Sequence, residues 1–102
     1  MSGARDLAEE LPDLILLARR CHDVHGPRAP GLFSQVLADV LALEDELQGE
    51  GLGRAAARLA SLRDLTGDFR APPEACTTWR TLWQGLGRLD REVRARLGPR
   101  AE

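Results

Sequence analysis

The sequence lacks the features that would place it in several familiar classes of protein. No apolar run approaches the roughly 20 residues that a membrane-spanning helix needs, and the N-terminus has no signal-peptide pattern. Charges of neither sign dominate, because the chain has 14 basic and 16 acidic residues and a formal net charge of −2. We therefore expect a cytoplasmic protein whose partners include neither nucleic acid nor a membrane.

Lysine, asparagine and tyrosine are absent, so that all 14 basic residues are arginine. We interpret this as a bias of genome composition rather than as a sign of guanidinium chemistry. The hydrophobic fraction of 43% is normal for a globular protein and argues against disorder. A length of 102 residues predicts a single domain, 1–102.

Motifs of nucleophilic catalysis are also missing. The chain has no phosphate-binding glycine loop, no CxxC pair and no serine in a nucleophile elbow. Its two cysteines, Cys21 and Cys76, are expected to be free thiols in a reducing compartment. We therefore do not expect an enzyme.

Apolar residues recur at helical spacing almost throughout, and no segment alternates with the period of a strand. This pattern predicts four helices, at about 5–25, 32–48, 52–66 and 73–97. Pro12 either marks the true first turn of the first helix or kinks a helix that starts near Arg5. The predicted fold class is all-α, a shortened up-down four-helix bundle. The third helix is short and rich in alanine, so that a homodimer covering this weak side is expected.

Three polar residues stand out on the predicted helices. His25 shares a face with apolar residues, and Glu46 and Glu50 are four apart on the second helix. Helical bundles bind iron with histidine and carboxylate side chains that face each other from neighbouring helices. The pattern equally fits a His25 that caps its helix and glutamates that lie in solvent. Structural zinc at Cys21-His22-x-x-His25 is not favoured, because no second Cys/His cluster completes it.

Several segments carry a resemblance to a known family. They are "ELPDLILLARRCHDVHG", "PGL", "LEDELQGE", "LRDLTGDF" and "PPEACTTWRTLWQGLGRLDREV". Together they resemble the RIC family, di-iron proteins for the repair of iron centres, which are hemerythrin-like bundles linked to nitrosative and oxidative stress. The resemblance spans about 7–101.

The resemblance implies a site of two irons held by five histidines and two glutamates. The family histidine of the "VHG" segment corresponds to His25, and the histidine and glutamate of the second helix correspond to Glu46 and Glu50. The remaining ligands fall on residues that are poor or impossible metal donors: Ala4, a position near Leu52, Arg96 and Arg100. The family's N-terminal domain with paired cysteines has no counterpart. The resemblance therefore implies a shortened and ligand-depleted form without a cofactor.

We expect Arg96, with Arg100, to occupy the space of the irons and to form ion pairs with Glu46 or Glu50. The alternative is an outward pair of Arg96 with Glu92.

The resemblance implies a non-catalytic interaction module in stress response, whose partner is a second copy or a full-length di-iron homologue. One alternative is a mononuclear site for iron, manganese or zinc made of His25, Glu46 and Glu50. Another is a residual role in iron–sulfur cluster repair.

Overall fold

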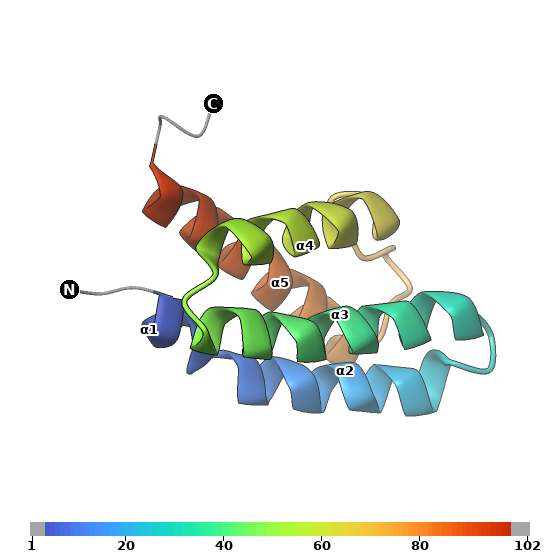
Figure 1. Cartoon of the computed structure of the whole chain (residues 1–102). Helices are drawn as coiled ribbons and strands as arrows, with labels where there is room; N and C mark the ends of the chain where they lie inside the picture. Colours follow the sequence, from blue (N-terminus) through green and yellow to red (C-terminus); the bar gives the residue numbers. More distant parts are fainter. Residues whose placement is uncertain (1–3, 99–102) are drawn as a thin grey trace.

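The computed structural model describes residues 4–98, and all the regular structure in that range is helical (Figure 1). The predicted all-α helical bundle is thereby confirmed. The helices are α1 (Ala4–Ala8), α2 (Leu11–His25), α3 (Pro30–Gln48), α4 (Leu52–Leu65) and α5 (Thr77–Leu97).

The first predicted helix is divided in two by a break at Glu9 and Glu10. Pro12 lies in the first turn of α2, which is one of the two positions expected for it. A proline ring clashes with the carbonyl group four residues earlier, which here belongs to Ala8. This clash explains why α1 ends at Ala8 and why the chain restarts as a new helix.

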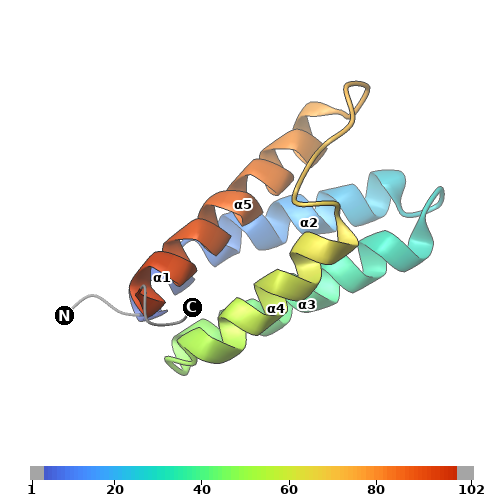
Figure 2. The ribbon, with the colours of Figure 1, turned by 90° about the horizontal axis from the view of Figure 1, so that it is seen from above.

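The last helix begins at Thr77, four residues later than predicted. The backbone before a proline is biased away from the helical region, so that Pro72 and Pro73 remain in the connection. After Thr66, this connection contains three consecutive residues of positive φ, Gly67, Asp68 and Phe69. It crosses from α4 to α5 above the bundle in Figure 2.

The four long helices pack around one apolar core. Neighbouring helices in the sequence are neighbours in space, and α5 closes the bundle by packing on both α2 and α4 (Figure 2). The short helix α1 packs on α3 and α5 at one end. The fully buried large side chains are Leu7, Leu11, Leu43, Leu47, Leu59, Leu62, Leu82, Leu86, Leu89, Val36, Val40 and Val93.

The helices α2 and α5 approach each other closely at Gly85. A Cβ atom at this position would lie 2.4 Å from Cδ2 of Leu14, so a larger residue would collide with the core. Within residues 4–98, no helix has the length and apolar character needed to cross a membrane.

Candidate functional site

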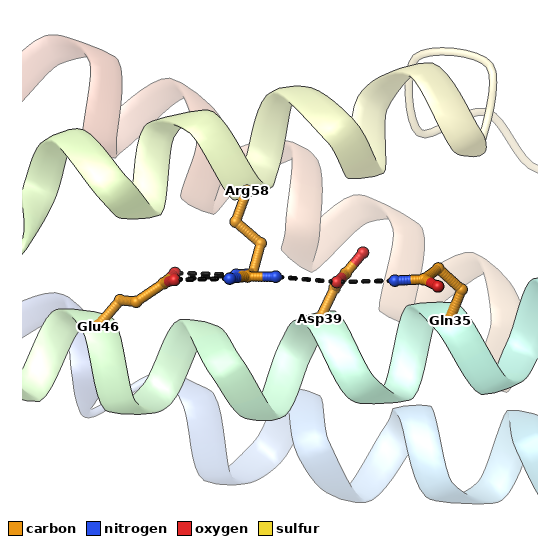
Figure 3. A network of polar contacts seen from close by, with 4 residues as sticks. All are labelled: Gln35, Asp39, Glu46 and Arg58. Carbon is orange, nitrogen blue, oxygen red and sulfur yellow. Dashed lines mark hydrogen bonds and ion pairs between the residues drawn. The ribbon is translucent and has the colours of Figure 1, made fainter.

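The most developed polar structure joins α3 to α4 (Figure 3). The Nε atom of Arg58 donates to both carboxylate oxygens of Glu46 at 3.0 Å, and Nη2 donates to Oε2 at 2.8 Å. The Nη1 atom donates to Oδ1 of Asp39 at 3.2 Å, and the amide of Gln35 donates to the same oxygen at 3.0 Å. One guanidinium therefore binds two carboxylates, and we call these four residues the Arg58 network.

The carboxylates of the Arg58 network are largely removed from water. The side chain of Glu46 is 14% exposed and that of Asp39 is 7% exposed. The hydrogen bonds to Glu46 raise the pKa of Arg58 above its ordinary value, although burial of the guanidinium opposes this. Arg58 is thus fixed as the cation that neutralises two carboxylates.

A second buried carboxylate joins α4 to α5. Oδ2 of Asp90 lies 3.2 Å from Nη1 of Arg63 and 3.0 Å from Nη2 of Arg94. The Asp90 side chain is 4% exposed, whereas both arginines reach solvent. As in the Arg58 network, the carboxylate is buried and the long arginine side chains extend to the surface.

The end of the bundle that holds α1 carries a further group of charges. Arg5 pairs with Glu50 at 3.3 Å, and Nη1 of Arg96 lies 4.0 Å from Oδ2 of Asp6. Burial raises the pKa of the nearby Glu10, as do the hydrogen bond that protonated Glu10 donates to Glu92 and the negative charge of Glu92. These groups lie beside Ala4, which is 2% exposed and offers no metal donor.

His25 lies in an aromatic group at the other end of α3. Its ring stacks on Phe33 with centroids 5.6 Å apart and lies 5.0 Å from the ring of Trp79. Its Nε2 atom is 3.0 Å from Sγ of Cys76. The Nε1 atom of Trp79 is buried without a hydrogen-bond partner among the described residues.

The structure does not bring His25 to the two glutamates. His25 packs on Phe33, and Glu46 lies 13 residues after Phe33 along α3, which corresponds to about 20 Å of helix. Nor do the glutamates project together. Because α3 ends at Gln48 and Glu50 has a φ of 59°, Glu50 does not continue the helical face of Glu46. Glu46 contacts Arg58 of α4, and Glu50 pairs with Arg5 of α1. Over residues 4–98, no three histidine, cysteine or carboxylate side chains gather as a metal site.

The arginine that neutralises Glu46 is Arg58 and not the expected Arg96. Arg58 lies on the neighbouring helix α4 and reaches the carboxylate directly, whereas Arg96 near the end of α5 lies beside Asp6. The second expected cation, Arg100, lies outside the described residues.

The residues present do not fit a pair of bridged irons. Of the described positions that the resemblance equates with ligands, His25 and Glu50 keep a donor group, whereas Ala4 and Arg96 offer none. The carboxylate of Glu46 is engaged by a guanidinium. A permanent cation repels a metal ion and has no lone pair to donate. Over the described residues the protein belongs to the class of all-helical bundles, with buried carboxylates that pair with arginines of neighbouring helices.

Comparison with curated proteins identifies distant relatives. The chain is 29% identical over 110 residues to "Iron-sulfur cluster repair protein YtfE" of Cronobacter sakazakii, covering 79% of this chain and 49% of that protein. It is 28% identical over 107 residues to the protein of the same name from Musicola paradisiaca, covering 78% and 48%. A Salmonella newport protein of that name is 28% identical over 112 residues, covering 79% and 50%.

The chain spans about half the length of the curated relatives it matches. No family model matches the chain. No solved structure matches it either. The distant similarity to iron–sulfur cluster repair proteins supports the resemblance to the RIC family.

Proposed function

We propose that this chain is a hemerythrin-like relative of the iron–sulfur cluster repair proteins that has lost the di-iron centre. In this proposal it is a non-catalytic interaction module in the response to nitrosative stress. The observation that carries the proposal is the two-point contact of Arg58 with Glu46, because this carboxylate occupies a position that the resemblance equates with a metal ligand.

The Arg58 contact opposes metal binding at Glu46 in two ways. A metal ion would have to displace a guanidinium that makes three hydrogen bonds to this carboxylate. The displaced Arg58 would then lose one of the two carboxylates that compensate its partly buried charge. A mononuclear site of His25, Glu46 and Glu50 has the further obstacle that His25 packs on Phe33, which lies about 20 Å of helix away from Glu46.

The proposed partner is a full-length di-iron homologue or a second copy of this chain. A shared bundle fold supports this choice, because a relative without metal can occupy the surface that a homologue uses to bind its own kind. Leu65, the last residue of α4, is 41% exposed. The expected homodimer would cover this side.

Elemental analysis of purified protein tests the loss of the metal centre. The chain and the Cronobacter relative are produced side by side in iron-supplemented medium, so that the relative controls for iron supply. We expect iron, manganese and zinc far below one atom per chain, and a melting temperature that added ferrous iron leaves unchanged. About one or two irons per chain would overturn the proposal.

Mass in solution tests the interaction. The chain is measured alone and mixed with the full-length relative at concentrations of about 10 µM, where transient complexes of micromolar affinity form. The proposal predicts either a dimer of the chain or a mixed species whose mass is the sum of the two proteins. A chain that stays monomeric in both samples would exclude both proposed partners at this affinity.

A further inference from the structure

Cys76 is an exposed thiol in contact with a histidine ring. It is exposed and immediately precedes α5, and its Sγ atom lies 3.0 Å from Nε2 of His25 at the end of α2. The two residues are 51 positions apart in the sequence, so that the fold brings them together. A thiol in contact with an imidazole nitrogen is the arrangement that activates cysteine nucleophiles.

The imidazole of His25 is held in place by its neighbours. It stacks on Phe33, which is 2% exposed, and lies against Trp79 of α5. With the proton of a neutral ring on Nδ1, the Nε2 atom accepts the thiol proton of Cys76. The packing of the ring therefore directs a proton acceptor at this sulfur.

A second thiol belongs to the same helix as His25. Cys21 precedes His25 by one helical turn on α2 and is completely buried. Burial raises the pKa of Cys21 to about 11, and the nearby Cys76 contributes to this shift. Cys21 therefore remains a protonated, inert thiol until an electrophilic sulfur appears beside it.

We propose that Cys76 is a site of oxidation by peroxides, with His25 as its proton acceptor and Cys21 as the thiol that completes a reversible disulfide. This inference uses residues remote from the Arg58 network and does not depend on the proposed function.

The chemistry balances with a peroxide as the oxidant. The Cys76 thiol gives its proton to Nε2 of His25, and its sulfur attacks one peroxide oxygen. The O–O bond breaks, the sulfenic acid of Cys76 forms, and the leaving oxygen takes up the proton as water or an alcohol. The Cys21 sulfur then attacks the sulfenic sulfur. A disulfide forms, the S–O bond breaks, and the hydroxyl leaves as water with the Cys21 proton.

The surroundings of Cys76 suit an oxidised sulfur. The Nε1–H group of Trp79, three residues after Cys76, is a buried donor that lacks an acceptor within residues 4–98. An oxygen added to the sulfur introduces a hydrogen-bond acceptor into this group. Cys76 itself is the N-cap of α5, where its carbonyl oxygen accepts a hydrogen bond from the backbone N–H of Arg80 at 3.1 Å, and the connection 66–75 before it contains no helix.

The test is a stopped reaction of the reduced chain with one equivalent of hydrogen peroxide, followed by mass spectrometry. The wild-type chain should lose two hydrogens and yield a linked pair of peptides that contain Cys21 and Cys76. In the Cys21→Ala variant, one oxygen should be added at Cys76 and be trapped by dimedone. The Cys76→Ser variant should not react.

The role of His25 is tested by rate. His25→Gln should slow oxidation by about tenfold or more, whereas His22→Gln, which changes the other histidine of α2, should leave the rate unchanged. Circular dichroism verifies that each variant is folded. Wild-type oxidation no faster than that of free cysteine, or equal rates in both histidine variants, would overturn the proposal. So would a stable sulfenic acid in the wild-type chain, because it would deny the role of Cys21.

Discussion

Arg58 binds Glu46 through two of its nitrogens, with Nε 3.0 Å from both oxygens and Nη2 2.8 Å from Oε2, while its Nη1 reaches Asp39. Such a two-point contact fixes both the distance and the orientation of the two side chains. Because Glu46 belongs to α3 and Arg58 to α4, the contact sets how these two helices face each other. It also makes Arg58 the shared counter-ion of two carboxylates.

Replacing Arg58 by methionine should lower the free energy of unfolding by about 1–3 kcal/mol. The change leaves the carboxylates of Glu46 and Asp39 partly buried and without their cation. This loss is smaller than that expected for breaking a fully buried ion pair, because the side chain of Arg58 is 35% exposed and solvent screens its charge. Chemical denaturation at neutral pH measures it.

Two control variants separate charge from geometry at this position. Arg58→Lys keeps the charge but loses the two-point contact, so that its stability should lie between those of wild type and Arg58→Met. Arg20→Met removes an exposed arginine of α2 and should cost about 0.5 kcal/mol or less. If Arg58→Met cost no more than Arg20→Met, the Arg58 network would have no stabilising role.

Asp90→Asn should destabilise the chain by about 1–2 kcal/mol. The substitution keeps the size of the side chain but removes the charge that holds Arg63 and Arg94. Asp64→Asn, at an exposed position of α4, is the matched control and should change stability by about 0.5 kcal/mol or less. Equal melting temperatures for the two variants would show that the buried pair contributes nothing net.

Gly85→Ala tests the close approach of α2 and α5. Alanine is better than glycine in a helix by about 1 kcal/mol, but its Cβ atom would lie 2.4 Å from Cδ2 of Leu14. Because Leu14 is itself buried, we expect overpacking to prevail, with a net loss of about 1 kcal/mol. Gly53→Ala in α4 meets no atom within 4 Å and should instead stabilise the chain. A gain in both variants would mean that α2 and α5 shift apart freely.

The helices were predictable from the sequence because apolar spacing and turn residues are local signals. The end of α4 near Leu65 and the end of α5 at Leu97 lie within a residue of the prediction. The break after Ala8 was the harder feature, because the pattern allowed Pro12 either to begin a helix or to kink one. Only the packing of α1 on α3 and α5 distinguishes a new helix that begins near Pro12 from a single kinked helix.

The Arg58 network was not predicted, although a signal existed. Asp39 lies on the buried face of α3 with Val36 and Val40, and a buried carboxylate requires a hydrogen-bonding or charged partner. The identity of that partner depends on how α4 is rotated against α3, which helical periodicity does not specify. The contact of His25 with Cys76 is likewise a consequence of tertiary packing, because 51 residues separate them.

The pH dependence of stability should carry a contribution from Glu10. Burial, the hydrogen bond that protonated Glu10 donates to Glu92, and the charge of Glu92 raise the pKa of Glu10 above 4.5, while Arg88 and Arg96 oppose this. An acid whose pKa is higher in the folded state binds more protons there, so that stability falls as pH rises through the window above 4.5. Glu10→Gln should remove this loss and stabilise the chain at neutral pH by about 0.5 kcal/mol or less.

Thermal melts at about pH 4 and pH 7 distinguish this effect from a general one, because linkage confines it to pH values above the ordinary pKa of a glutamate. The gain from Glu10→Gln should be present at the higher pH and shrink at the lower one, where wild-type Glu10 is protonated. Glu9→Gln removes a negative charge from the exposed neighbouring residue and is the matched control for a general effect of charge at this end of the bundle. A gain of equal size at both pH values would exclude ionised Glu10 as its source, since the proton on Glu10 would then have no bearing on stability.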